Sequence, residues 1–311
     1  MSPAPDVTGA PERRHALLIT LNFACVYLVW GSTYLAIRIA IHDLPPALVA
    51  GTRFTVAGAL LFAWLAWRRA PLPPRELWGP IALTGMLLLF GANFLVTWSE
   101  LYVASGMAAV IVANLPFFMV ILESLRKDGE RLNLMGVVGL LVGFAGMWIL
   151  MGPKIATMGA GQGLGGFKGE LALLGANLCW AVGSIYSKHR IKGVAPLMAG
   201  ALEMLVAGIA LTILGLALGE AGSFHPTPRA LKAIAWLVVG GSLLGYTSYL
   251  WLLNHVPAAK VSTYAYVNPV IAMALGAIVL DEPLTLRMAI GTAVILAGVA
   301  VVNVAKIKFR A

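Results

Sequence analysis

Residues 46–58 read PALVAGTRFTVAG, and residues 196–208 read PLMAGALEMLVAG. Each segment opens with a proline and closes with Val-Ala-Gly, and the second starts 150 positions after the first, at 196 against 46. Both segments begin long apolar runs of the kind that cross a bilayer as helices. The pair therefore predicts a chain built from two copies of one helical membrane unit.

Further matches occur in the same order along the two halves, at offsets between 150 and 153 positions. They are Gly31-Ser32-Thr33-Tyr34 with Gly183-Ser184-Ile185-Tyr186, Arg38 with Arg190, Pro116 with Pro269, Glu130-Arg131-Leu132 with Glu282-Pro283-Leu284, and Gly139 and Gly146 with Gly291 and Gly298. An ordered series at a nearly constant offset indicates an internal repeat rather than chance similarity.

The composition places most of this chain in a membrane. Hydrophobic residues make up 60% of the 311 positions, and charged residues make up 11%. A soluble domain carries roughly 25% charged residues, so we exclude a soluble globular enzyme and a disordered chain. The net charge of +9 does not indicate a nucleic-acid partner, because the basic residues are few and scattered.

The apolar runs predict an all-α membrane protein with ten transmembrane helices. A helix that crosses the bilayer needs about 20 mostly apolar residues. Runs of this length recur along the chain and lack the strict alternation of barrel strands. They cover residues 17–37, 46–67, 79–99, 105–125, 133–151, 170–188, 196–218, 232–252, 261–280 and 286–305.

Because each unit has an odd number of helices, the second unit must be inverted relative to the first. We therefore expect two inverted five-helix repeats, an architecture typical of transporters that work by alternating access. The expected divisions are an N-terminal tail (1–16), the first repeat (17–151), a Gly-rich linker (152–169), the second repeat (170–305) and a basic C-terminal tail (306–311).

The basic residues predict the orientation. If the N-terminus is cytoplasmic, most of the 22 Lys and Arg residues lie in cytoplasmic segments, as the positive-inside rule requires. We therefore expect a multi-pass protein of a bacterial-type inner (plasma) membrane with both termini in the cytoplasm.

Three short motifs add a family resemblance. They are Trp30-Gly31-Ser32-Thr33-Tyr34 in the first helix, Arg53-Phe54 in the second, and Glu282-Pro283-Leu284-Thr285 before the last. Together with the two five-helix units, they resemble the drug/metabolite transporter superfamily, within it the EamA family of exporters and, among these, aromatic amino acid exporters of the YddG type. The resemblance implies export of amino acids and similar small metabolites.

Polar and aromatic side chains recur at helical spacing within several spans, where polar groups are costly and therefore informative. Ser242, Tyr246 and Tyr249 form one stripe, and Phe90, Asn93, Phe94 and Thr97 form a matching one. The other candidates are Trp30, Thr33 and Tyr34 in the first span, Asn177, Trp180 and Ser184 in the sixth, and Tyr264, Tyr266 and Asn268 in the ninth.

We interpret these stripes as the lining of a central cavity. Rings provide contact area, and amides and hydroxyls replace lost water, which suits small amphipathic solutes. Individual Tyr and Trp residues can instead anchor a span at the membrane interface, and Asn and Ser can instead serve helix packing. A purely structural role therefore stays open for each single residue.

Two further pairs occupy equivalent positions in the repeats. Pro116 and Pro269 each remove a backbone donor within a span and are interpreted as kinks or hinges. Arg53 and Glu203 lie inside their spans and are interpreted as ion-paired or gating residues, with Glu203 also the candidate acid for proton coupling. The expected partner of Arg53 is Glu100, and those of Glu203 are Lys188, Arg190 or Lys260.

No motif indicates catalysis, a metal or a cofactor. The sequence lacks a phosphate-binding loop, and its two cysteines and five histidines suggest no metal site. We expect a transporter rather than an enzyme, in contact with the lipid bilayer and a small-molecule substrate. The oligomeric state stays open, and a monomer is compatible with the sequence.

The leading function is export of amino acids, above all aromatic or bulky apolar ones. The alternatives are a multidrug or other metabolite transporter and, less favoured, an intramembrane enzyme or a passive channel. Uniport, exchange and proton antiport all stay open.

Overall fold

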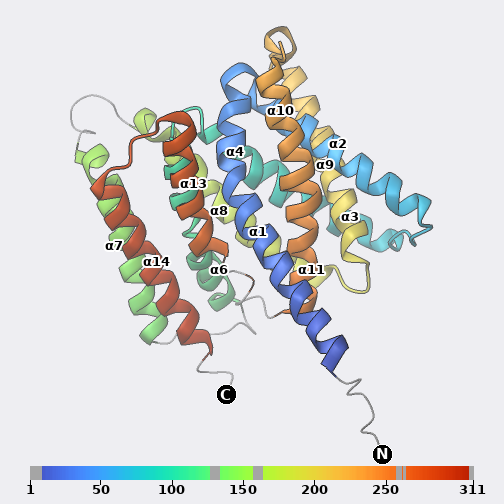
Figure 1. Ribbon diagram of the computed structural model, residues 1–311, viewed down its shortest axis with the longest axis horizontal. Helices are drawn as coiled ribbons and strands as arrows, with labels where there is room; N and C mark the ends of the chain where they lie inside the picture. The colour runs from blue at the N-terminus through green and yellow to red at the C-terminus, as the bar shows by residue number, and fades with distance from the viewer. Residues whose placement is uncertain (1–8, 127–133, 157–163, 257–260, 262–263, 308–311) are drawn as a thin grey trace, which may run out of the picture.

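The computed structural model describes residues 9–126, 134–156, 164–256, 261 and 264–307. Within these residues the regular structure is helical throughout, and the helices pack side by side in one bundle (Figure 1). Parts of the expected tails and linker (1–8, 157–163 and 308–311) lie outside the described residues, as do Glu130 and Lys260.

The first repeat contains five spans. They are α1 (Gly9–Asp43), α2 (Pro46–Trp67), a third span made of α3 (Trp78–Gly85), η2 (Met86–Asn93) and α4 (Phe94–Ser99), a fourth made of α5 (Ser105–Val112) and α6 (Leu115–Ser124), and α7 (Leu134–Ala156). The second span agrees with the expected range 46–67. Helix α1 begins earlier and α7 ends later than expected, because helices continue past the apolar run into polar residues.

The second repeat contains the matching five. They are α8 (Lys168–Arg190), α9 (Pro196–Ala217), an eighth span made of α10 (Pro228–Trp236), η6 (Leu237–Tyr246) and α11 (Thr247–His255), then α13 (Tyr264–Leu280) and α14 (Leu286–Ile307). The protein is therefore an all-α membrane protein of ten transmembrane helices in two inverted five-helix repeats. Seven spans among the described residues are both long and apolar enough to cross a membrane by length and composition alone.

The third and eighth spans contain an irregularity that the sequence analysis did not anticipate. Both η2 and η6 are π-helical segments, and they occupy equivalent places in the two repeats. A π-helix bonds i to i+5 instead of i to i+4 and is found frequently at functional sites. The duplicated segments thus mark the same level of the bundle in each half.

Helices α2 and α9 cross at an interface of matched glycines. A Cβ atom on Gly58 would lie 2.8 Å from the backbone nitrogen of Leu205, and Gly208 lies in the same way against Thr55. These contacts exchange under the repeat offset of 150 positions, since 58 and 55 correspond to 208 and 205. The crossing is therefore a pseudo-two-fold contact between the repeats.

Helices α7 and α14 form a second matched pair at one edge of the bundle (Figure 1). Gly139 lies against Gly298 and Val302, and Gly146 lies against Gly291 and Ile295. Small residues allow such backbones to approach closely in a membrane. The small-residue spacing in this span therefore serves packing within one chain.

Replacing Gly58 with alanine should destabilise the fold by about 1–3 kcal/mol, the usual effect of overpacking. The added methyl meets the backbone nitrogen of Leu205 on α9, which cannot move aside as the end of a flexible side chain would. Thermal unfolding of the detergent-purified protein measures the loss. Gly79→Ala is the matched control, because nothing lies within 4 Å of a Cβ atom there. Equal stability of the two variants would contradict the close approach.

Candidate substrate cavity

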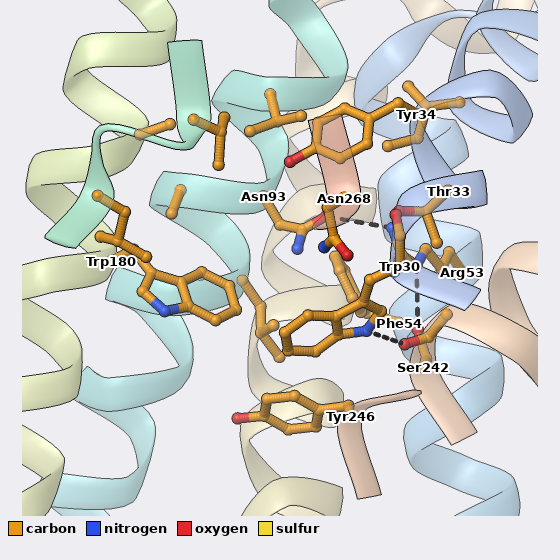
Figure 2. Close-up of a pocket in the computed structure, with 18 of the residues that line it drawn as sticks. Trp30, Thr33, Tyr34, Arg53, Phe54, Asn93, Trp180, Ser242, Tyr246 and Asn268 are labelled. Carbon is orange, nitrogen blue, oxygen red and sulfur yellow. Dashed lines mark hydrogen bonds between the residues drawn. The ribbon is translucent and has the colours of Figure 1, made fainter. Parts of the chain in front are cut away.

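A cavity lies between the two repeats, at the level of the π-helical segments. Its walls come from α1, α2, η2, α4 and the α5–α6 region of the first repeat, and from α8, α9, η6 and α13 of the second. The space open to the centre of a water-sized molecule is about 90 Å³. Figure 2 shows the rings of Tyr34, Trp30, Trp180 and Tyr246 around this space.

Arg53 is the single charged residue among the described residues that line the cavity. Its side chain is 5% exposed. Nε donates to Ser242 Oγ at 3.0 Å, and Nη1 donates to Asn93 Oδ1 at 3.1 Å (Figure 2). Both partners are neutral and belong to the π-helical segments of opposite repeats. The guanidinium group is therefore held in place without being neutralised.

The expected ion pairs differ from the contacts observed. Arg53 is not within ion-pair distance of Glu100 in the described part of the chain. Glu203 is buried and accepts a hydrogen bond from the Tyr246 hydroxyl at 2.5 Å. It forms no ion pair with Lys188 or Arg190, whose side chains are exposed. The physical reason is that hydroxyl and amide partners inside the bundle lie closer than the charges at the span ends.

Trp30 organises the aromatic wall. Its Nε1 donates to the carbonyl of Gly241 at 3.0 Å, and its ring lies over the glycine face of η6. The centroid of its ring is 6.1 Å from that of Trp180 and 5.2 Å from that of Tyr264, both edge to face. Edge-to-face pairs of this kind stabilise aromatic clusters by about 0.5–1.5 kcal/mol each.

Nine of the candidates proposed from sequence line the cavity in addition to Thr33. These are Trp30, Tyr34, Asn93, Asn177, Trp180, Ser242, Tyr246, Tyr264 and Asn268. Phe90, Phe94, Thr97, Ser184 and Tyr249 do not line it. Tyr249 packs behind Trp30, at 5.1 Å between ring centroids. The side chain of Tyr266 lies outside the described residues.

The misplaced candidates that follow a π-helical segment, Phe94, Thr97 and Tyr249, have a physical cause in common. An α-helical stripe assumes that residues at i, i+3, i+4 and i+7 face one way. The wider π turns of η2 and η6 rotate the residues that follow them, so Phe94 and Thr97 leave the face that Asn93 occupies. Apolar lining residues such as Phe54 and Met204 were missed, because nothing in their type separates them from ordinary core residues.

The fourth span is broken beside the cavity. Helix α5 ends at Val112, and α6 begins at Leu115 with Pro116 in its first turn. The carbonyl of Ile111 accepts hydrogen bonds from the side-chain amides of Asn114 and Asn177, both at 3.0 Å. Asn177, a cavity residue, therefore also holds the break in place.

Pro269 behaves differently, because it lies inside the continuous helix α13. When the neighbouring Asn268 amide is oriented to face acceptors, it donates to the carbonyl of Tyr27 at 3.1 Å and to that of Tyr264 at 3.3 Å. The two prolines are equivalent in sequence, yet one accompanies a break and the other an unbroken helix.

Carboxylates close one end of the bundle, the upper end in Figure 1, where α1 meets α2. We call this the Glu282 end. Glu282 accepts hydrogen bonds from the amide and hydroxyl of Ser105, both at 2.9 Å, and from the amide of Gly106 at 3.1 Å. Glu220 accepts from the amides of Ala47 and Leu48 at the start of α2. Each carboxylate from the second repeat thus caps a helix N-terminus of the first, where negative charge is favoured.

Two inverted helical units that enclose a buried cavity define a polytopic membrane transporter. The chain belongs to the EamA-like transporter family, which matches residues 17–152 and 167–304. The transporter motif Glu282-Pro283-Leu284-Thr285 thereby gains a structural role. Glu282 caps α5, and the Thr285 hydroxyl accepts from the amide of Met288 at the start of α14.

Known relatives support the same class. The uncharacterized inner membrane transporter YedA of Escherichia coli is 37% identical over 288 residues, covering 92% of this chain and 90% of that one. The uncharacterized transporter YoaV of Bacillus subtilis is 26% identical over 282 residues, covering 90% and 95%. A solved crystal structure matches with a TM-score of 0.68 at 22% identity, over 92% of this chain and 97% of the other, and this shows the shared fold.

Proposed function

We propose that this protein exports small amphipathic carboxylates, with aromatic and bulky apolar amino acids as the leading class. The inverted repeats would rock about the cavity and open it to one side of the membrane at a time. We further propose that the protein lies in the inner membrane with both termini in the cytoplasm, so that the Glu282 end faces outward.

The observation that carries the proposal is the uncompensated charge of Arg53 in an aromatic cavity. Within the described residues, its Nη2 atom makes no hydrogen bond, and no carboxylate forms an ion pair with it. A buried charge is costly unless it is paired. A substrate carboxylate would complete the pairing, and the planar guanidinium fits such a group with two parallel hydrogen bonds.

The rings supply the other half of the recognition. Trp30, Trp180 and Tyr264 offer apolar faces and edges to the cavity that Arg53 enters. An amino acid with an aromatic or bulky apolar side chain matches both features. Its carboxylate would pair with Arg53, and its side chain would pack against the rings. Small polar solutes would leave the rings without a partner.

A multidrug or general metabolite transporter of the same fold is the second candidate. It is favoured by the walls, most of which are apolar or aromatic. The two candidates differ in what they require of the solute, because drug-like cations would be repelled by Arg53 whereas carboxylates would be attracted.

Flux measurements on the purified protein in liposomes test the proposal. The liposomes are loaded in turn with radiolabelled phenylalanine, tryptophan, leucine, alanine and lysine. We expect saturable efflux that is fastest for the aromatic and bulky apolar amino acids and is inhibited by an excess of unlabelled phenylalanine. Efflux that is linear in concentration and shows no competition would contradict a carrier. Saturable efflux of cationic drugs but of no amino acid would favour the second candidate.

A further inference from the structure

Glu100 is a buried acid that does not line the cavity. It follows α4 directly and is 0% exposed. Neither carboxyl oxygen has a hydrogen-bond partner among the described residues. Buried polar groups in native proteins are nearly always hydrogen-bonded, so two orphaned oxygens on one buried carboxyl group call for an explanation.

The surroundings of Glu100 are mixed in charge. From α1, it is approached by Tyr34, which lines the cavity, and by Arg38 one turn further on. From the segment before α14, the carboxylate of Glu282 acts on it. Helix α8 packs against the end of α4 through Gly169, beside Glu170.

Deeper in the bundle, α2 also packs against α4 and contributes Arg53, which is bound to Asn93 and Ser242. Arg38 and Arg53 are thus the buried or half-buried cations described on these elements, whereas Lys168 beside Gly169, and Lys188 and Arg190 at the far end of α8, are exposed. Arg53 is turned to the cavity, and Arg38 is not within ion-pair distance in the described residues.

Three features favour the neutral, protonated form of this carboxyl group. Burial without hydrogen bonds penalises the charged form. The position at the C-terminus of α4 places the group at the negative end of the helix dipole. The neighbouring Glu282 carboxylate repels a second negative charge. Arg38 alone, half-buried on α1, favours the ionised form.

We propose that Glu100 is a proton-binding site that couples transport to the proton gradient. Its carboxyl group takes up a proton from the outer medium while the Glu282 end is open, carries it while this end is closed, and releases it to the cytoplasm through the cavity beside Tyr34 when the opposite end opens. Protonation from an acidic outer side is then required for the end to close again. The coupling rests on the proposed export function, whereas the bound proton does not.

A proton fits this site better than a metal cation. A hard cation takes several oxygen ligands. The hydroxyl groups of Ser99 and Ser105 are already engaged, since Ser99 donates to the carbonyl of Val96 and Ser105 donates to Glu282. A single carboxyl group with two free oxygens is sufficient for a proton. Tyr34 connects this site to the cavity. It interacts electrostatically with Glu100 and also lines the substrate cavity.

Infrared spectroscopy of the full-length protein in lipid nanodiscs tests the bound proton without any substrate. At neutral pH we expect a carbonyl-stretching band of a protonated carboxyl group. Because Glu203 is a second buried acid, the spectra are compared in a Glu203→Gln background, in which Glu100→Gln should remove this band and the exposed Glu76→Gln should leave it unchanged. Glutamine mimics a neutral carboxyl group, so Glu100→Gln should also keep the thermal stability of the parent protein. A band that persists unchanged when Glu100→Gln is added to Glu203→Gln would overturn the proposal.

Flux in proteoliposomes tests the coupling. With radiolabelled phenylalanine inside, acidification of the outer medium should speed efflux severalfold in the parent protein and in Glu76→Gln. In Glu100→Gln, efflux should continue down the phenylalanine gradient with no response to the outer pH. A full response in Glu100→Gln, or a response lost instead in Glu203→Gln, would overturn the coupling. A parent protein that carries no amino acid refutes the proposed function, and the infrared result still decides the proton site.

Discussion

Arg53→Gln should abolish the ability of the transporter to distinguish phenylalanine from phenylalaninamide. In the parent protein we expect phenylalanine to be preferred, because its carboxylate pairs with a guanidinium that is already positioned by Ser242 and Asn93. A charge-assisted contact of this kind contributes about 2 kcal/mol, which corresponds to a roughly 30-fold change in affinity. The variant should therefore show a Michaelis constant for phenylalanine raised by about this factor, with that for phenylalaninamide little changed.

Two companion variants keep this result interpretable. Arg53→Lys retains the charge but not the planar fork, so it should recover part of the preference for the carboxylate. Arg75→Gln removes an exposed arginine outside the cavity and should leave both constants unchanged. Each variant must elute as a single species before its flux is measured. If Arg53→Gln still discriminated between the two solutes, Arg53 would not bind the carboxylate.

Glu282→Ala should open the Glu282 end. The carboxylate accepts three hydrogen bonds at the start of α5, and no other side chain in the described residues replaces them there. Their joint loss is on the order of 3 kcal/mol, which is a roughly 150-fold shift in the balance between closed and open forms. The contact joins the two repeats, so its loss acts directly on their relative position.

Cysteine labelling measures this opening. Cys25 and Cys179 are first replaced by serine, and Val103→Cys then places a thiol at a site that is 5% exposed in the closed form. Glu282→Ala should increase the rate at which a membrane-impermeant maleimide labels this thiol by one to two orders of magnitude. Glu76→Ala provides the comparison, since its carboxylate is exposed and lies in the short helical turn Arg75–Leu77 that leads into α3. Unchanged labelling would mean that the cap does not hold this end closed.

The sequence was sufficient for the fold because its signals were strong and long. Apolar runs of about 20 residues have few alternatives in a membrane, and the second span was placed at its observed bounds of Pro46 and Trp67. The odd number of helices in each repeat then required the inversion. These arguments do not depend on the placement of any one side chain.

The site could be predicted only in part, because it depends on local departures from the regular helix. Ser242 and Asn93 were found as members of stripes, but their role in holding Arg53 follows from π turns that no periodicity indicates. The partner of Glu203 was sought among distant charges and proved to be the hydroxyl of Tyr246. The unpartnered state of Glu100 is a property of three-dimensional packing alone.

The crossing of α2 and α9 is made where Gly58 and Gly208 bring backbone against backbone. Interdigitated side chains would have to change rotamers for one helix to roll over the other, and each such change has its own barrier. A contact made at glycine has no side chain on that residue that must change rotamer. The crossing is therefore the contact about which the two halves would tilt in the proposed transport cycle.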